Sequence, residues 1–227
     1  MINVSARSHV AEQPSPAMLR RILVLAPHTD DAELGCGGTI ARFIEEGSEV
    51  FVTAFSTAGE TLPPGAPPDT LRNEFLHAMD KIGVDQQNLS VLSYRVRRFT
   101  YQRQEILEDM VTLRKRINPT LVIIPCAADS HQDHETVHGE ANRAFANCSI
   151  WGYELPWNTT AFRADTFVVL QQSHIDTKWE ALRQYASQMQ LGRHYFSREF
   201  IEGLARVRGV QVKALLAEAF EALRMVW

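Results

Sequence analysis

Two short polar segments of the chain carry side chains that together could bind a metal ion and move a proton. The first is residues 28–31 (HTDD) and the second is residues 131–134 (HQDH). Imidazole and carboxylate groups are the ligands of a catalytic Zn²⁺, which uses three of them and leaves one position for water. Neither segment alone offers three ligands in an obvious geometry, so the fold would have to bring both together. A plainer interpretation is that Asp30, Asp31 or Asp133 only caps the helix that follows it.

Each polar segment lies in the loop after an apolar run that predicts a buried β-strand, over residues 22–26 and residues 120–125. In open α/β sheets, ligands bind beyond the carboxyl ends of the strands. We therefore expect both segments to lie at the same edge of one sheet and to share a site. After the first segment, three glycines and a helical pattern over residues 39–46 complete a strand–loop–helix unit.

The remaining chain alternates predicted strands with predicted helices. Strands are predicted at 49–55, 89–92, 149–153 and 166–170, and helices at 71–82, 105–117, 134–146, 175–190 and 198–208. This alternation predicts an α/β fold, a Rossmann-like three-layer α/β/α sandwich with a mainly parallel sheet. We expect residues 21–227 to form a single domain. Residues 1–20 are rich in Ser, Pro and Gln and are expected to form a mobile N-terminal arm.

Composition excludes several classes of function. The chain has 227 residues, 45% of them hydrophobic, and a formal net charge of −4, which argues against nucleic acid or an anionic membrane as the main partner. Its three cysteines lack CxxC spacing, which argues for a reducing compartment and against a disulfide framework or a thiolate zinc site. Neither a signal-peptide pattern nor an apolar run of transmembrane length is present in the sequence. We expect a cytoplasmic protein without stable membrane insertion.

The two polar segments also resemble the motifs of a known family. HTDDAELGCGGTI resembles the His-Pro-Asp-Asp-Glu signature of the LmbE-like (PIG-L) zinc N-deacetylases, and HQDH resembles their His-x-Asp-His motif. The segments LRNEFLHAMDKIGV, YELPWN, KWEALRQYASQ, LARVRG and AEAFEALR also fit this family, so the resemblance covers nearly the whole chain. Thr29 replaces the usual Pro, and the signature Glu falls at Glu33 rather than directly after the second Asp.

Carried over by position, the resemblance implies a zinc site with His28, Asp31 and His134 as its ligands. The same ligand set also suits Fe²⁺ or Co²⁺. Asp30 would be the general base for the water that the metal activates. Bound Zn²⁺ lowers the pKa of a coordinated water to about 7, so an adjacent carboxylate can complete its deprotonation.

The resemblance also implies roles around the substrate. His131, as an imidazolium, would stabilise the tetrahedral oxyanion and then protonate the leaving amine. Asp133 would accept the ring N–H of His131. Arg72 resembles an arginine that family members use on the sugar or its phosphate. A basic, aromatic loop carries Arg97, Arg98 and Arg103. These arginines could bind an anionic part of the substrate, or they could simply be solvated.

Two other motifs need to be weighed. Residues 134–138 (HETVH) match HExxH, in which both histidines bind zinc and Glu135 would be the base of a peptidase. That interpretation leaves the first polar segment unexplained and makes His138 a ligand rather than a surface or supporting histidine. The glycine spacing in GCGG is not G-x-G-x-x-G, so close packing explains it better than dinucleotide binding. Cys36 and Cys148 are expected to be buried fillers.

We therefore expect a zinc-dependent N-deacetylase that acts on an amino sugar or sugar conjugate. The alternatives are an HExxH peptidase and a non-catalytic α/β binding module. The expected partner is a small N-acetylated sugar or sugar conjugate, and the apolar stretch near the C-terminus could support a homo-oligomer. The sequence leaves open which sugar is used and whether it is free, nucleotide-linked or lipid-linked.

Overall fold

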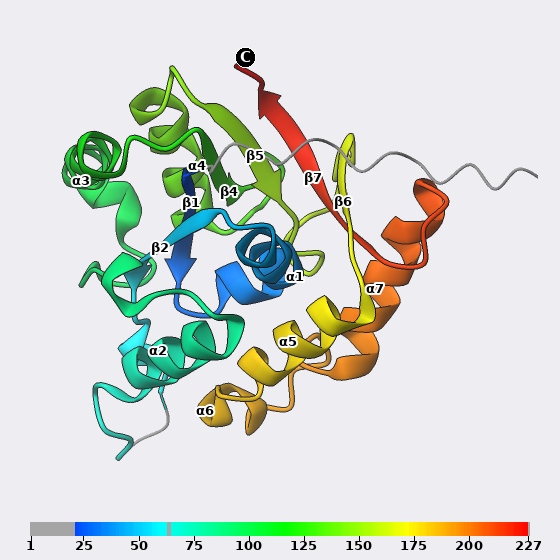
Figure 1. Cartoon of the computed structure of the whole chain (residues 1–227). Coiled ribbons are helices and arrows are strands. Elements are labelled where there is room, and N and C mark those ends of the chain that lie inside the picture. The colour runs from blue at the N-terminus through cyan, green and yellow to red at the C-terminus, as the bar shows by residue number, and fades with distance from the viewer. Residues whose placement is uncertain (1–20, 63–64, 227) are drawn as a thin grey trace, which may run out of the picture.

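The computed structural model describes residues 21–62 and 65–226, and the predicted N-terminal arm lies outside these residues. Its centre is a seven-stranded sheet with the order β3-β2-β1-β4-β5-β7-β6. Helices cover both faces of the sheet (Figure 1), so the fold is the predicted Rossmann-like three-layer α/β/α sandwich. The strands are β1 (Arg21–His28), β2 (Glu49–Ser56), β3 (Leu89–Val91), β4 (Leu121–Pro125), β5 (Ser149–Tyr153), β6 (Thr166–Val169) and β7 (Ala217–Arg224).

Two hydrophobic cores separate the three layers. One face of the sheet is covered by α1 (Asp31–Glu45), α2 (Thr70–Ile82), α5 (Gln172–Leu182) and α7 (Arg198–Gln211). The other face is covered by α3 (Arg103–Ile117) and α4 (Gln132–Ala144). Short helical turns complete the set: α6 (Ala186–Met189) and the 3₁₀ turns η1 (Gly59–Thr61), η2 (Gln86–Asn88) and η3 (Phe99–Gln102).

Strand β1 is apolar throughout because it is buried on both faces. Its side chains alternate, so that Val24 faces the core beneath α1 whereas Leu23 and Leu25 face the core beneath α3 and α4. A strand with two buried faces needs a continuous apolar run rather than alternation. This is why the sequence pattern identified β1 and β4 correctly.

The order of strands reverses direction between β1 and β4. From β1 the chain proceeds to β2 and β3 on one side, and it later returns to β4 and β5 on the other. β1 pairs in parallel with both β2 and β4, so the loops that follow β1 and β4 emerge beside each other. Such a reversal point is where open α/β sheets bind their ligands.

The structure corrects three predicted elements. Helix α1 begins at Asp31 rather than Thr39 and contains the glycines. Gly35 lets the helix lie close to the sheet, because a Cβ there would be 2.3 Å from Cδ2 of Tyr153. The single helix predicted over 175–190 is α5 and α6, separated where the Tyr185 hydroxyl turns inward and donates to the carbonyl of Thr29. Strand β7 was not predicted, and β5–β7–β6 is antiparallel.

None of the helices within the described residues is both long and apolar enough to cross a membrane.

Candidate active site

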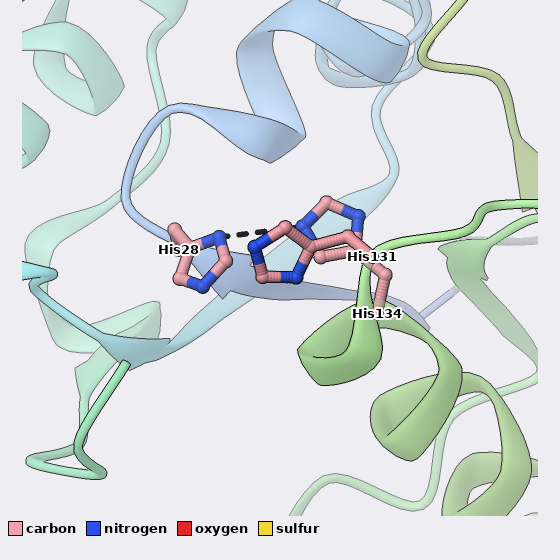
Figure 2. Close-up of side chains that lie close together, drawn as sticks. All are labelled: His28, His131 and His134. Atoms are coloured by element: carbon pink, nitrogen blue, oxygen red, sulfur yellow. Dashed lines mark hydrogen bonds between the residues drawn. The ribbon is translucent and has the colours of Figure 1, made fainter. Parts of the chain in front are cut away.

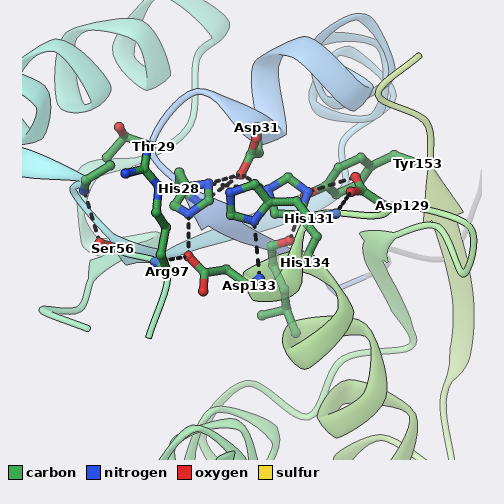
Figure 3. Close-up of polar contacts among 12 residues, drawn as sticks. His28, Thr29, Asp31, Ser56, Arg97, Asp129, His131, Asp133, His134 and Tyr153 are labelled. Carbon is green, nitrogen blue, oxygen red and sulfur yellow. Dashed lines mark hydrogen bonds and ion pairs between the residues drawn. The ribbon is translucent and has the colours of Figure 1, made fainter. Parts of the chain in front are cut away.

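Three potential ligand atoms from the two polar segments lie close together beyond β1 and β4. His28 Nδ1 and His134 Nε2 each lie 3.2 Å from Asp31 Oδ2, and the two nitrogens are 3.3 Å apart. Figure 3 shows these side chains converging from β1 and from the start of α1 and α4. A tetrahedral ion with ligands at about 2.0–2.1 Å separates neighbouring ligand atoms by about 3.3–3.4 Å. The three atoms therefore have the spacing that a divalent metal requires.

The remaining ring nitrogen of each of these histidines contacts a carboxylate. His28 Nε2 lies 3.1 Å from Asp133 Oδ2, and His134 Nδ1 lies 2.8 Å from Asp129 Oδ2. A carboxylate in this position accepts the ring N–H, fixes the tautomer and leaves the opposite nitrogen free as a ligand. The chemistry of the donor set thus fits a bound metal.

His131 lies beside these ligands but is held differently. One nitrogen from each of His28, His131 and His134 lies within 4.8 Å of the others, and Figure 2 shows the three rings together. His131 caps α4, because its Nδ1 accepts the backbone N–H of Asp133 at 3.2 Å. This leaves Nε2 to carry the proton of a neutral ring. Burial, and then the charges of His134 and His28, lower the pKa of His131 to about 4, which disfavours the expected imidazolium.

The structure places the Asp133 carboxylate against His28 rather than against the His131 ring, where it was expected. Besides His28, it accepts the backbone N–H groups of Arg97 at 2.6 Å and Phe99 at 3.3 Å. The reason is that α4 begins at Gln132, so the backbone of Asp133 serves the His131 cap while its side chain points to β1 and the 97–99 turn. Asp133 therefore orients His28.

The charges within the cluster are strongly coupled. Burial raises the pKa of Asp31, but the neighbouring His134 and His28 hold it well below its usual value. Burial lowers the pKa of His134, but Asp31 and Asp129 raise it to about 10. The pKa of His28 is also raised, since its bonds to Asp133 and Asp31 outweigh burial. Without a metal, His134 therefore retains a proton on both ring nitrogens at neutral pH.

Asp30 lies next to this cluster on the cavity wall. Its side chain makes no capping hydrogen bond to α1, so the plain interpretation of Asp30 as a helix cap does not describe the structure. Burial and the charge of Asp31 raise the pKa of Asp30 to about 6, against smaller opposing effects of His28 and Arg193. A carboxylate with a pKa near neutrality is suited to accept and return a proton.

A cavity of about 220 Å³ opens in front of the site. Its walls include the loops after β1, β2, β3, β4 and β5 and the segment between α6 and α7. Two aromatic side chains, Trp157 and Tyr195, line it. Of the four arginines predicted to meet the substrate, Arg97 lines this cavity. Its backbone has a φ of +62°, a left-handed conformation that is uncommon outside glycine.

The other three predicted arginines do not line this cavity. Arg103 pairs with the fully buried Glu140, with 2.7 Å between Nε and Oε1. Arg98 lies over the ring of Tyr101 at 5.5 Å. Arg72 is exposed on α2. Among the described residues the cavity has a second arginine, Arg193, which was not predicted.

The HExxH match does not form a metal site in this fold. Glu135 is exposed on α4. His138 Nδ1 lies 2.9 Å from the carbonyl oxygen of Pro125, and its Nε2 lies 3.2 Å from the amide of Asn142. Both ring nitrogens of His138 therefore have partners outside the cluster. His138 supports the local structure and is not placed to bind a metal with His134.

Four residues of the site were not predicted from the sequence: Asp129, Arg193, Tyr195 and Trp157. A signal for Asp129 was present, since it is a second carboxylate in the loop that carries the HQDH motif. The other three come from segments more than 20 residues away from either motif, and local sequence carries no signal that they line this cavity.

Comparisons with known proteins identify the family of the chain and its fold. A family model described as PIG-L, GlcNAc-PI de-N-acetylase, matches residues 23–145, which include both polar segments. A curated relative from Escherichia coli (strain K12), described as the uncharacterized deacetylase YaiS, is 27% identical over 170 residues. The match covers 73% of this chain and 90% of the relative.

Two solved structures show the same fold. N,N'-diacetylchitobiose deacetylase from Pyrococcus horikoshii superposes with a TM-score of 0.75 at 20% identity, covering 90% of this chain and 84% of that one. GalB, the 4-carboxy-2-hydroxymuconate hydratase from Pseudomonas putida KT2440, has a TM-score of 0.74 at 21% identity, covering 92% and 98%. Because the fold carries both a deacetylase and a hydratase, fold similarity alone does not fix the reaction.

Proposed function

The chain belongs to the GlcNAc-PI de-N-acetylase (PIG-L) family, and from that premise we propose that it is a metal-dependent hydrolase that removes the acetyl group from an N-acetylated amino sugar or sugar conjugate. The observation that carries the proposal is the triangle of His28, Asp31 and His134, whose ligand atoms lie 3.2–3.3 Å apart. Two carboxylates outside this triangle hold both histidines in the tautomer that a metal needs. A binding module that kept these residues only as helix caps would require none of these contacts.

We assign the metal to His28, Asp31 and His134, and Zn²⁺ is the ion that this ligand set suits best. Fe²⁺ and Co²⁺ are the alternatives for the same ligands. When bound, such an ion supplies a water of lowered pKa and polarises the amide carbonyl of the substrate. Asp31 is favoured over His131 as the third ligand for two reasons. Its Oδ2 lies 3.2 Å from both histidine nitrogens, and Nδ1 of His131 is already used by the α4 cap.

The protein's own residues would move the protons. Asp30 accepts a proton from the attacking water as the new C–O bond forms at the acetyl carbon. It then returns that proton to the leaving nitrogen as the C–N bond breaks, which releases acetate and a free amine. The raised pKa of Asp30, about 6, supports both steps. His131 donates a hydrogen bond from Nε2 to the carbonyl oxygen, where negative charge develops. In this proposal a neutral His131 replaces the imidazolium that family resemblance implies.

The test combines metal analysis with acetate release from N-acetylated sugars. We expect Asp31→Asn to lose metal and activity together. His131→Gln should retain its metal and lose about 10²–10³ in kcat, which is the usual effect of removing one oxyanion donor. Full metal content in Asp31→Asn, combined with metal loss in His131→Gln, would make His131 the ligand instead.

A second pair of variants separates the deacetylase from the peptidase. Asp30→Asn should keep its metal and lose about 10²–10⁴ in rate, because the base is removed. Glu135→Gln is the matched control, since Glu135 is exposed. An inactive Glu135→Gln together with an active Asp30→Asn would overturn the assignment of the base.

A further inference from the structure

Arg193 is a cation in the wall of the active-site cavity that none of the site chemistry above uses. It lies in the segment between α6 and α7 and is partly buried. Its Nη1 donates to the hydroxyl of Tyr195 at 2.8 Å, and its guanidinium carbon lies 5.8 Å from the centre of the Tyr195 ring. Both residues line the cavity together with Asp30 and His131.

The guanidinium has donors to spare. It carries five N–H groups, and one of them is used by the Tyr195 hydroxyl. Arg208, another partly buried arginine, is by contrast neutralised by two hydrogen bonds to Glu154. Arg193 forms no ion pair with a carboxylate of residues 21–62 or 65–226. Its charge is therefore available to a molecule in the cavity.

The surroundings of Arg193 hold it in place. The Tyr195 ring stacks on Trp157 with 3.7 Å between ring centres and 10° between ring planes. Next to Trp157, the carbonyl of Asn158 accepts from both the backbone N–H and the hydroxyl of Ser130, at 3.1 and 2.8 Å. The wall that carries Arg193 is thus tied to the loop that carries His131. A donor fixed in this way loses little entropy when it binds a ligand.

A second cation, which forms no ion pair within the described part of the chain, faces the same space. Arg97 lines the cavity, and the hydrogen bond from its backbone N–H to Asp133 holds the left-handed turn that presents it. Two guanidiniums and two stacked aromatic rings around one cavity suit an anionic group, because guanidinium binds carboxylate and phosphate through paired hydrogen bonds.

We propose that Arg193 is a specificity-determining residue that binds a carboxylate or phosphate group on the N-acetylated substrate, with Arg97 as the second cation of the same subsite. This inference rests on the proposed deacetylase function and defines its substrate as an acidic sugar or sugar conjugate. Tyr195 is a positioning residue, because it acts through Arg193.

The test measures kcat/KM for three probes: neutral N-acetylglucosamine, N-acetylglucosamine 1-phosphate and N-acetylmuramic acid, which carries a carboxylate. We expect the wild type to prefer at least one acidic probe, and the phosphate and carboxylate probes identify which anion is used. Arg193→Gln should lower the ratio of acidic to neutral kcat/KM by about tenfold to a hundredfold, the effect of one charge-assisted contact. The ratio is the readout because Arg193 also influences the nearby base Asp30, and that effect applies to every probe.

Matched variants separate recognition from structure. Arg206→Gln removes an exposed arginine of α7 and should leave the ratio unchanged. Arg193→Lys keeps the charge without the planar fork and should recover part of the preference. Tyr195→Phe keeps the stacked ring and should lower the ratio by a smaller factor than Arg193→Gln.

Binding provides a readout that does not depend on turnover. In a metal-loaded Asp30→Asn background, calorimetry should show tighter binding of an acidic probe than of the neutral one, and Arg193→Gln should abolish that difference. Equal affinities for all three probes, or a preference that survives Arg193→Gln, would overturn the inference. Acetate release without any acidic preference would overturn it while leaving the deacetylase proposal intact. Acidic binding without acetate release from any probe would contradict the deacetylase proposal alone.

Discussion

The side chains of His28 and His134 show how the site orients its histidines through carboxylates. Each ring offers one nitrogen to the cluster, and a carboxylate occupies the other, Asp133 for His28 and Asp129 for His134. These carboxylates come from the loop after β4 and from the start of α4, so the second motif region orients both proposed ligands. The orientation of the proposed ligands therefore depends on residues outside the proposed metal triangle.

Asp129→Asn should consequently weaken metal binding by about 10- to 100-fold, because an amide accepts the ring N–H less strongly and does not balance its charge. The measurement is a competition titration against a chromophoric chelator. Asp85→Asn, at an exposed turn, is the control and should bind metal like the wild type. Unchanged affinity in Asp129→Asn would remove the orienting role.

Metal affinity should also depend on pH. In the metal-free protein the neighbouring carboxylates outweigh burial and raise the pKa of His134 to about 10, so that His134 is protonated at neutral pH. A metal must displace that proton, and its apparent affinity should rise about tenfold per pH unit for each proton released. Dissociation constants at pH 6, 7 and 8 provide the measurement. An affinity that did not change over this range would mean that the histidines are already neutral.

At the scale of single elements, helix α1 is interrupted, and a buried ion pair compensates for the interruption. Cys36 has non-helical dihedrals, and the backbone groups on either side of it have side-chain partners. The carboxylate of Glu218 accepts the N–H of Gly38 at 3.1 Å, and Lys178 Nζ donates to the carbonyl of Leu34 at 2.8 Å. Lys178 and Glu218 are 2.7 Å apart and nearly fully buried. The pair therefore joins α1, α5 and β7.

Removing one partner of this pair should destabilise the fold strongly. Lys178→Met leaves the Glu218 charge buried without its partner, and we expect a loss of about 3–5 kcal/mol in the free energy of unfolding, measured with denaturant. Arg183→Gln breaks the exposed Arg183–Glu180 pair and should cost no more than about 1 kcal/mol. Similar small losses in both variants would show that the buried pair is not needed to hold α1.

The close approach of α1 to the sheet gives a second test at this scale. In Gly35→Ala the new methyl group would lie 2.3 Å from Tyr153 Cδ2, so we expect a loss of about 1–3 kcal/mol from overpacking. Gly139→Ala in α4 is the matched control, because its Cβ would meet nothing within 4 Å. It should stabilise the protein by about 0.5–1 kcal/mol through reduced backbone entropy. Thermal unfolding of both variants distinguishes packing from helix propensity, and equal shifts would contradict the close packing.

At the scale of the whole molecule, all three cysteines lie inside the two cores or at their borders. Cys36, Cys126 and Cys148 are buried, and burial raises the pKa of each thiol. Because the thiolate is the reactive form, the folded protein should resist alkylation at pH 8, whereas all three cysteines should react in denaturant. Mass spectrometry after timed alkylation measures this. Rapid labelling of a cysteine in the native protein would reveal local opening of that part of the fold.

The sequence by itself determined the architecture and the location of the site. Strands buried on both faces must be continuously apolar, so residues 22–26 and 120–125 could be recognised without knowledge of their neighbours. Parallel strands end at the same edge of a sheet, which is why two polar segments about 100 residues apart could be expected to converge. Those inferences depend only on local patterns and on the geometry common to α/β sheets.

Tertiary structure alone decided the partners of the side chains and the elements that contradict local preference. AEAFEALR consists largely of residues that favour helix, yet it forms β7 because it pairs between β5 and β6 and buries Phe220. Asp133 turned to His28, and Arg193 reached the cavity from a segment about 60 residues beyond the second motif. Helix propensity is worth a few tenths of a kcal/mol per residue, and packing and hydrogen bonding across the fold outweigh it.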